Sequence, residues 1–128
     1  MTYKIHQAVV IGSGTMGAAI AAHLANAGVP VTLLDIVPEG ATEKSARNKI
    51  VNEGWDRCLK AKPANLMSAE LKTFVKLGNL EDDFGVIAEA DWVCEAIVEN
   101  LKIKQALMAR IDEVRKPNAI VSTNTSGI

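Results

Sequence analysis

The sequence predicts a doubly wound α/β domain with a mainly parallel five-stranded sheet of strand order 3-2-1-4-5. Short apolar runs alternate with segments of helical periodicity, which is typical of a parallel sheet covered by helices on both faces. A cluster of glycines lies between the first apolar run and the first helical segment. The length of 128 residues fits one domain and leaves no room for a second of ordinary size.

The first strand, the first helix and the second strand form one unit. Gln7–Ile11 is a short apolar run without helical periodicity, as expected of a strand buried on both faces. From Thr15 to Ala27 the residues are small or strong helix formers, and Gly28 with the following Pro30 ends the helix. Val31–Leu34 predicts a second buried strand. The length of about thirty residues is that of a βαβ unit, whose right-handed crossover makes the two strands parallel.

The middle of the chain has a weaker pattern. Ala41–Ala61 is polar with apolar residues at helical spacing and predicts one solvent-facing helix, although Gly54 and Pro63 weaken the pattern. Thr73–Leu77 predicts a third, less buried strand. The acidic run Glu81–Asp83 predicts the solvated first turn of a further helix, where negative charge complements the helix dipole.

The last part of the chain returns to a clear alternation. Trp92–Val98 predicts the fourth strand, Asn100–Arg115 predicts a helix that ends before Pro117, and Ala119–Ser122 predicts the fifth strand. No internal repeat, low-complexity tract or linker interrupts the chain. We therefore expect one domain over residues 1–128.

The composition excludes several classes of function. Hydrophobic residues make up 48% of the chain and charged residues 23%, which is enough apolar surface for a core. Fourteen basic and fifteen acidic residues give a formal charge of −1, so no broad attraction to nucleic acid or to an anionic membrane is expected. No stretch reaches the roughly 18 apolar residues that span a bilayer, and the first residues lack the layout of a signal peptide. We expect a cytoplasmic protein that binds any anion locally.

The cysteines and histidines do not suggest a metal site. Cys58 and Cys94 have neither CxxC nor CxxH spacing and are expected to be reduced structural thiols. The two histidines, His6 and His23, are isolated from each other and from the cysteines. We therefore predict no bound metal.

A GxGxxG motif joins the first strand to the first helix and predicts a dinucleotide-binding Rossmann fold. Gly12 allows the tight turn, Gly14 lets the backbone approach a pyrophosphate, and Gly17 lets the helix pack close to the sheet. The helix N-terminus presents unpaired amides and the positive end of the dipole, so it can hold a diphosphate without a basic side chain. The cofactor-binding residues expected from this motif are Gly12, Ser13, Gly14, Thr15, Met16 and Gly17.

Asp35 lies 18 residues after Gly17, at the end of the second predicted strand, where the adenosine ribose is expected. A carboxylate there accepts hydrogen bonds from the ribose hydroxyls and repels a 2′-phosphate, and no arginine follows within the next few residues. These features predict NAD rather than NADP. The alternative is a structural glycine turn followed by a chance aspartate.

Three segments make the chain resemble the NAD-binding domain of the 3-hydroxyacyl-CoA dehydrogenases over essentially all of its length. They are GSGTMGAAIAAHLANAG with VTLLD, then ADWVCEAIVENLKIK, and finally IVSTNTSGI. A dinucleotide fold in general requires neither the acidic EAIVEN after the fourth strand nor the NTS after the fifth. Both segments follow strands of a parallel sheet, and ligands of such sheets bind outside the carboxyl ends of the strands.

The resemblance implies roles for four further residues. Glu99 and Lys104 match cofactor contacts of the family, with Glu99 near the nicotinamide and Lys104 reaching the same site from the following helix. By spacing alone, Lys102 fits as well as Lys104. Ser126 matches the family serine whose hydroxyl bonds the 3-oxygen of the substrate, and Asn124 is a neighbour that helps to fix the loop. Without the resemblance, this run is a turn whose side chains bond their own backbone.

The resemblance also implies an activity, the oxidation of the 3-hydroxyl of a fatty acyl-CoA to a ketone during β-oxidation, with hydride transfer to NAD. The family takes up the hydroxyl proton with a histidine paired with a glutamate, and these residues lie beyond residue 128. We expect the front portion of a longer enzyme, closest to the large multidomain bacterial type, whose helical C-terminal domain completes the acyl-CoA site and provides a homodimer contact. His6 and His23 lie away from the carboxyl edge of the predicted sheet, so the 128 residues alone are expected to bind NAD without turnover.

Two other functions fit the glycine motif. Dehydrogenases of the 6-phosphogluconate or 3-hydroxyisobutyrate type also have a glycine run that contains methionine, but many of them carry Asn-Arg where this chain has Asp35-Ile36. A comparison of the affinities for NAD and NADP distinguishes these enzymes from a 3-hydroxyacyl-CoA dehydrogenase. The other alternative is a module that binds a dinucleotide without chemistry.

Overall fold

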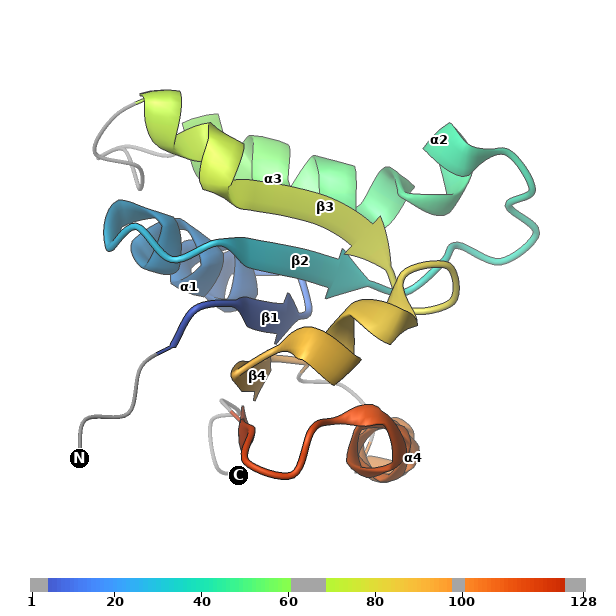
Figure 1. Ribbon diagram of the computed structural model, residues 1–128. Helices are drawn as coiled ribbons and strands as arrows, with labels where there is room; N and C mark the ends of the chain where they lie inside the picture. The colour runs from blue at the N-terminus through green and yellow to red at the C-terminus, as the bar shows by residue number, and fades with distance from the viewer. Residues whose placement is uncertain (1–4, 61–68, 98–100, 124–128) are drawn as a thin grey trace.

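The computed structural model describes residues 5–60, 69–97 and 101–123 (Figure 1). Five strands, each parallel to its neighbours, form one sheet of order β3-β2-β1-β4-β5, as the sequence predicts. The strands are β1 (Ala8–Ile11), β2 (Val31–Asp35), β3 (Val75–Asn79), β4 (Trp92–Glu95) and β5 (Ile120–Thr123). The helices are α1 (Thr15–Asn26), α2 (Lys44–Arg47), α3 (Lys49–Lys60) and α4 (Leu101–Val114), with the 3₁₀ helices η1 (Ala69–Phe74) and η2 (Phe84–Glu89).

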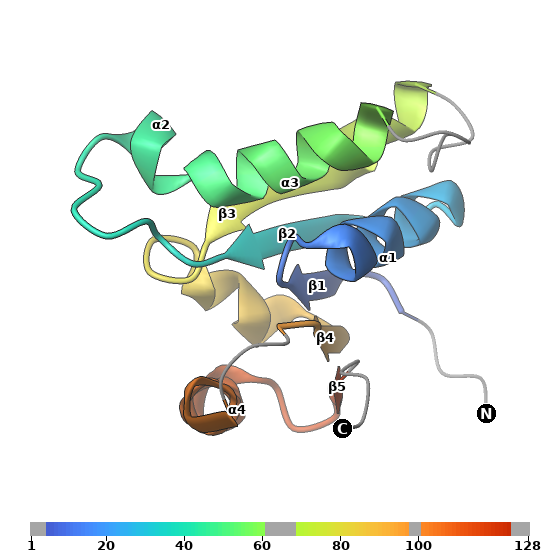
Figure 2. The same ribbon diagram turned by 180° about the vertical axis from the view of Figure 1, so that it is seen from behind.

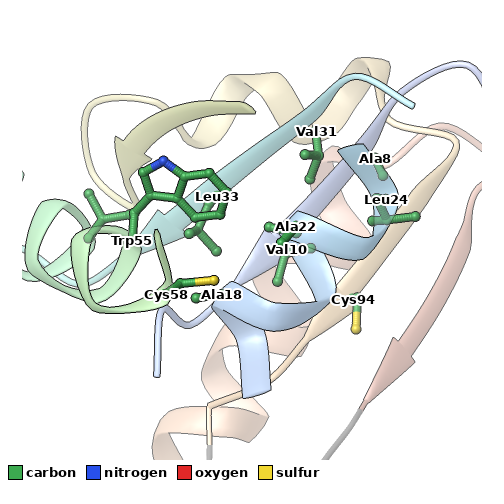
Figure 3. Close-up of a cluster of buried hydrophobic side chains, with 12 residues drawn as sticks. Ala8, Val10, Ala18, Ala22, Leu24, Val31, Leu33, Trp55, Cys58 and Cys94 are labelled. Atoms are coloured by element: carbon green, nitrogen blue, oxygen red, sulfur yellow. The ribbon is translucent and has the colours of Figure 1, made fainter. Parts of the chain in front are cut away.

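Helices cover both faces of the sheet because successive residues of a strand point to opposite faces. Val10 and Leu33 face α1 and α3 in one core cluster, which also contains Trp55 (Figure 3). Leu34 belongs to the second cluster, with Ile111 of α4 and residues of η2. Figures 1 and 2 show these layers from opposite sides. In the described ranges, no helix combines the length and the apolar character needed to cross a membrane.

The cysteines and tryptophans of the described chain serve packing, which the sequence predicts for the cysteines. Cys58 and Cys94 are buried and form no disulfide, and burial raises the pKa of the Cys94 thiol. Trp55 is a buried residue of α3. Trp92 packs against the same cluster and donates a hydrogen bond of 2.8 Å from its indole nitrogen to the Ser122 hydroxyl, which links β4 to β5.

The third strand lies two residues later than predicted. The sequence predicts that it ends at Leu77, before Gly78 and Asn79, whereas the strand runs from Val75 to Asn79. Gly78 and Asn79 are buried and continue the pairing with the end of β2. Glycine is needed at position 78 because a β-carbon there would lie 2.5 Å from the Asp83 carboxylate. Packing therefore overrides the turn preference of these two residues.

Two helix predictions are also corrected. The single helix predicted over residues 41–61 is divided into α2 and α3 at Asn48, whose side-chain oxygen accepts a hydrogen bond of 2.8 Å from the Asn79 amide. The acidic run does not begin an α-helix, since Asp83 makes no side-chain cap and is followed by the 3₁₀ helix η2. Glu81 and Asp82 instead pair with Arg47 at 3.2 and 2.9 Å, and thereby tie α2 to the loop after β3.

Asp91 joins three parts of the chain at the amino edge of the sheet, where the parallel strands begin. Its carboxylate accepts hydrogen bonds from the backbone amides of His6 and Gln7, at 2.7 and 3.1 Å, and pairs with the Lys116 ammonium. The Lys116 ammonium and the two amides lower the pKa of Asp91 to about 2. The Asp91 backbone also bonds Gln7 and Ile120. We call Asp91, Lys116 and the amides of His6 and Gln7 the amino-edge clamp.

Candidate functional site

The loop between β1 and α1 turns sharply and brings the helix against the sheet. Gly12 has a φ of +107°, a left-handed conformation that favours glycine, and its amide donates to the Leu34 carbonyl at 2.7 Å. A β-carbon on Gly17 would lie 1.7 Å from the carbonyl oxygen of Gly12, so a larger residue would push the helix away. Gly12 and Gly17 therefore have the two mechanical roles that the motif predicts.

The N-terminus of α1 is open to solvent. Gly14 is its N-cap residue and has no side-chain cap, and a β-carbon on Gly14 would meet no atom within 4 Å. Met16 is 52% exposed, and the first turn holds no acidic residue. The first amides of a helix have no partner within the helix. No contact within the described structure requires glycine at position 14. A bound diphosphate would accept hydrogen bonds from the free helix amides and would occupy the open space beside Gly14.

Asp35, the last residue of β2, is held against the glycine loop. Its Oδ2 accepts hydrogen bonds from the amide and the hydroxyl of Ser13, at 2.7 and 2.5 Å, and its Oδ1 accepts one from the Ile36 amide at 2.7 Å. Ser13 is 2% exposed, so its bonds to Asp35 form away from water. An ionised carboxylate has about four acceptor positions, so Asp35 retains capacity for a ribose hydroxyl. The structure brings together the two parts of the motif that the sequence predicts to share the adenosine side of a cofactor.

Gly54 in α3 is a site residue whose role the sequence analysis missed. The pattern treats this glycine only as a weakness in a predicted helix. A β-carbon on Gly54 would lie 2.1 Å from the Ser13 carbonyl oxygen and 2.6 Å from the Ser13 hydroxyl oxygen. The Ser13 hydroxyl also lies 3.3 Å from the Ile50 carbonyl, at the start of the same helix. Gly54 therefore lets α3 lie directly on the glycine loop and shield the contact between Ser13 and Asp35.

A small hollow of about 270 Å³ lies next to the residues that directly follow Asp35. It is lined by Ile36, Val37, Leu80, Glu81, Ile97, Ala106, Leu107 and Arg110. The Arg110 guanidinium lies 4.1 Å from the centroid of the Phe84 ring and donates to the Leu80 carbonyl at 3.4 Å, so it forms a fixed wall. Aliphatic walls and a planar cation suit a flat heteroaromatic ring.

A larger hollow in the described structure lies elsewhere. It measures about 640 Å³, covers the α1 side of β4 and β5, and includes Trp92, Cys94 and Ser122. Of the predicted cofactor-binding residues it includes Met16 alone. Size is therefore a poor guide here, and the smaller hollow next to Asp35 is the one that adjoins the predicted chemistry.

A buried carboxylate lies at the carboxyl edge of the sheet, where the parallel strands end. Glu95, the last residue of β4, is 1% exposed. Its Oε2 accepts a hydrogen bond of 2.5 Å from the Ile97 amide, and its Oε1 accepts one of 2.7 Å from the Thr123 hydroxyl at the end of β5. The same Oε1 lies 3.4 Å from the Lys104 ammonium of α4. We call Glu95, Lys104 and Thr123 the carboxyl-edge cluster.

Comparison with known proteins identifies the family. Residues 7–128 match the family described as 3-hydroxyacyl-CoA dehydrogenase, NAD binding domain. This chain belongs to that family. The match decides against the 6-phosphogluconate and 3-hydroxyisobutyrate dehydrogenase types that the glycine run left open, and NAD is the cofactor that Asp35 predicts.

Individual relatives of this NAD-binding domain agree. A probable 3-hydroxyacyl-CoA dehydrogenase from Deinococcus radiodurans is 50% identical over 125 residues, which are 98% of this chain and 35% of that protein. A protein of the same description from Bacillus subtilis is 48% identical over 139 residues and covers 100% of this chain, which spans 18% of it. The crystal structure of 3-hydroxybutyryl-CoA dehydrogenase from Escherichia coli has a TM-score of 0.74 and 30% identity, over 98% of this chain and 26% of that one. The chain therefore spans well under half the length of these relatives.

The predicted residues of the NAD-binding domain are only partly within the described structure. Glu99, Asn124 and Ser126 lie outside the described residues. Of the two candidate lysines, Lys104 reaches the sheet edge, where its side chain is 14% exposed, whereas Lys102 is exposed on α4.

Glu95 was not predicted as a site residue of this domain. A signal for it did exist, because a glutamate inside the apolar run WVCEAIV needs a partner if the run is buried.

The described residues include no group of three or more His, Cys, Asp or Glu side chains that is arranged to hold a metal ion.

Proposed function

We propose that this chain is the NAD-binding part of an NAD-dependent 3-hydroxyacyl-CoA dehydrogenase, which oxidises the 3-hydroxyl of a fatty acyl-CoA in the cytoplasm during β-oxidation. The observation that carries the proposal is the pair of hydrogen bonds that the Asp35 carboxylate accepts from the amide and the hydroxyl of Ser13. These bonds fix an acid beside the open N-terminus of α1. The descriptions of the relatives from D. radiodurans and B. subtilis support the acyl-CoA substrate. A homodimer contact belongs to the parts of such an enzyme that follow this domain.

The strand order supports one direction for the dinucleotide along the carboxyl edge. Asp35 ends β2, the glycine loop follows the central β1, and Glu95 ends β4 on the other side of β1. The adenine then belongs in the small hollow after Asp35, its ribose on the Asp35 carboxylate, and the diphosphate on the amides after Gly14. The nicotinamide half belongs at the ends of β4 and β5, next to Lys104 and to the predicted contacts Glu99 and Asn124.

The chain's own residues hold the reactants and leave the proton transfer to another group. NAD, when bound, accepts the hydride from C3 of the substrate. The Ser126 hydroxyl bonds the 3-oxygen of the 3-hydroxyacyl-CoA and orients that carbon, and Asn124 fixes the loop that carries Ser126. Removal of the hydroxyl proton needs a base at the carboxyl edge. His6 lies at the amino edge and His23 is exposed in the last turn of α1, so neither serves.

Calorimetric titration of the 128-residue chain with NAD and NADP tests the proposal. We expect NAD to bind at least about tenfold more tightly than NADP, because Asp35 repels a 2′-phosphate, and Asp35→Ser to remove most of this preference. Asp56→Asn is the matched control, since Asp56 is an exposed carboxylate on α3 that pairs with Lys60 at 2.8 Å. Absence of binding by either dinucleotide, or tighter binding of NADP, contradicts the proposal.

Assay of the same chain with 3-hydroxybutyryl-CoA and NAD tests the division of labour. No NADH formation above the uncatalysed level is expected. Sustained NADH production would show that the 128-residue chain itself supplies a base, and would contradict this part of the proposal.

A further inference from the structure

We infer that Glu95 is a positioning residue for the nicotinamide half of the cofactor and acts by holding the Lys104 ammonium in place. The inference rests on the proposed function, which assigns Lys104 to that half. It concerns a residue that the sequence did not predict and that needs no contact with the cofactor itself.

The burial of Glu95 is the first argument. A carboxylate that is 1% exposed is costly to bury unless several donors satisfy it. Glu95 has the Ile97 amide, the Thr123 hydroxyl and the Lys104 ammonium as partners. Because buried ion pairs are weak stabilisers compared with apolar packing, stability alone gives little reason for a charge at this point of the core.

The second argument is what these partners border. Ile97 lines the small hollow proposed for the adenine, and Thr123 is directly followed by Asn124 and lies three residues before Ser126. Lys104 lies in α4 and reaches back to the strand end, with 14% of its side chain exposed. One carboxylate thus connects the exit of β4, the exit of β5 and the lysine.

The third argument is the donor capacity of Lys104. An ammonium has three N–H donors, and the contact of 3.4 Å with Oε1 of Glu95 engages one of them. A lysine on a surface helix samples many rotamers, and ordering its side chain has an entropic cost. Glu95 restrains the Lys104 ammonium before the cofactor binds. The entropic cost of ordering this side chain therefore does not reduce the binding free energy of the cofactor.

The strand order makes the inference selective. Asp35 lies on the β2 side of β1, and the carboxyl-edge cluster lies on the β4 side. Loss of Glu95 should therefore weaken binding of NAD, which carries the nicotinamide riboside, and leave binding of ADP, which lacks that riboside, nearly unchanged. A purely structural glutamate would affect both ligands alike.

The experiment measures the affinities of the 128-residue chain for NAD and for ADP by calorimetry, in the wild type, Glu95→Gln, Lys104→Met and the double variant. We expect Glu95→Gln to weaken NAD binding by about fivefold and ADP binding by less than about twofold. We expect the double variant to bind NAD no more weakly than the weaker single variant, because both changes remove one interaction.

Asp91→Asn is the matched control, since Asp91 is a buried carboxylate directly before the same strand and pairs with a lysine at the opposite edge. It should change neither affinity. Thr123→Val is a second variant in case Glu95→Gln does not fold, because it removes the hydroxyl that donates to Glu95. It should weaken NAD binding by about twofold to threefold without affecting ADP binding.

The outcomes separate the inference from the proposed function. Equal losses for the two ligands, no loss of NAD affinity in the folded Glu95 or Thr123 variants, or additive effects of Glu95→Gln and Lys104→Met would overturn the inference while NAD binding by the wild type stands. Failure of the wild type to bind NAD would instead remove the proposed function.

Discussion

The two ends of β4 carry the same chemical device in different surroundings. At each end a buried carboxylate pairs with a lysine: Asp91 with Lys116 at the amino edge, and Glu95 with Lys104 at the carboxyl edge. Lys104 lies near the start of α4 and Lys116 lies just after its end, so that the helix is fastened to both ends of one strand.

The partners of the two carboxylates differ in what they border. The amino-edge clamp joins the segment before β1 to the start of β4 and to the connection before β5, and the sequence predicts no functional residue there. In the carboxyl-edge cluster, Thr123 directly precedes Asn124, and Ile97, whose amide donates to Glu95, lines the small hollow. A buried ion pair is therefore not evidence of function in itself. Its neighbours decide what it does.

Replacement of Gly17 by alanine should have the largest effect, and it should affect stability and binding together. The added β-carbon would lie 1.7 Å from the Gly12 carbonyl oxygen, so α1 must move away from the loop. We expect the free energy of unfolding to fall by about 3 kcal/mol and NAD affinity to fall more than about tenfold. Urea unfolding and calorimetric titration measure the two effects.

Gly28→Ala is the control at the amino edge. Gly28 has a φ of +79°, and a β-carbon there meets no atom within 4 Å, so the substitution introduces backbone strain without a clash. A loss of about 1 kcal/mol with unchanged NAD affinity is expected. If Gly17→Ala leaves NAD affinity unchanged, the loop is not shaped by its contact with α1.

Replacement of Asp91 by asparagine should lower stability and leave binding intact. The amide keeps an acceptor for the His6 and Gln7 amides but loses the charge that pairs with Lys116. We expect a loss of about 2 kcal/mol in the free energy of unfolding at pH 7 and no change in NAD affinity. A change in NAD affinity would contradict the division of roles between the two edges.

The contribution of Asp91 should also depend on pH. Its pKa in the folded chain is about 2, below the ordinary value of 3.8, so the ionised form is favoured by folding. The stabilisation is fully present above pH 3.8 and is lost as the pH falls from about 4 to about 2. The difference in unfolding free energy between wild type and Asp91→Asn should therefore shrink over that range. A difference that stays constant down to pH 2 would show that Asp91 does not titrate as the geometry requires.

Local pattern was sufficient to predict most of the fold. The apolar runs of β1, β2 and β4 contain residues with almost no exposure, such as Val10, Leu33 and Val93. A strand that is buried on both faces consists almost entirely of apolar residues, so the run itself identifies the strand. The glycine spacing also predicted the turn at Gly12 and the close contact at Gly17.

The failures have a common physical cause, which is contact between residues far apart in the chain. The predicted third strand stops before Asn79 because the hydrogen bond that the Asn79 side chain donates is accepted by Asn48, which lies far away in sequence, between α2 and α3. Gly54 was treated as a helix weakness because the Ser13 carbonyl that it must admit lies about 40 residues away in sequence. Glu95 was passed over because its hydroxyl partner, Thr123, lies on another strand. None of these partners can be inferred from the neighbours of the residue in sequence.

Replacement of Gly14 by alanine should have the smallest effect on stability and should isolate binding. Any residue can adopt its φ of −66°, and a β-carbon there meets no atom within 4 Å. The only loss of stability comes from the N-cap position, where alanine is less favourable than glycine. We expect the free energy of unfolding to change by less than about 1 kcal/mol, while NAD affinity falls by about tenfold because a methyl group occupies the space for the diphosphate. Gly85→Ala in η2 is the matched control, since a β-carbon there also meets nothing within 4 Å and Gly85 does not line the small hollow. Equal NAD affinities of the two variants would mean that the space beside Gly14 is not where the diphosphate lies, and the carboxyl edge would then lose the feature that most distinguishes it from the amino edge.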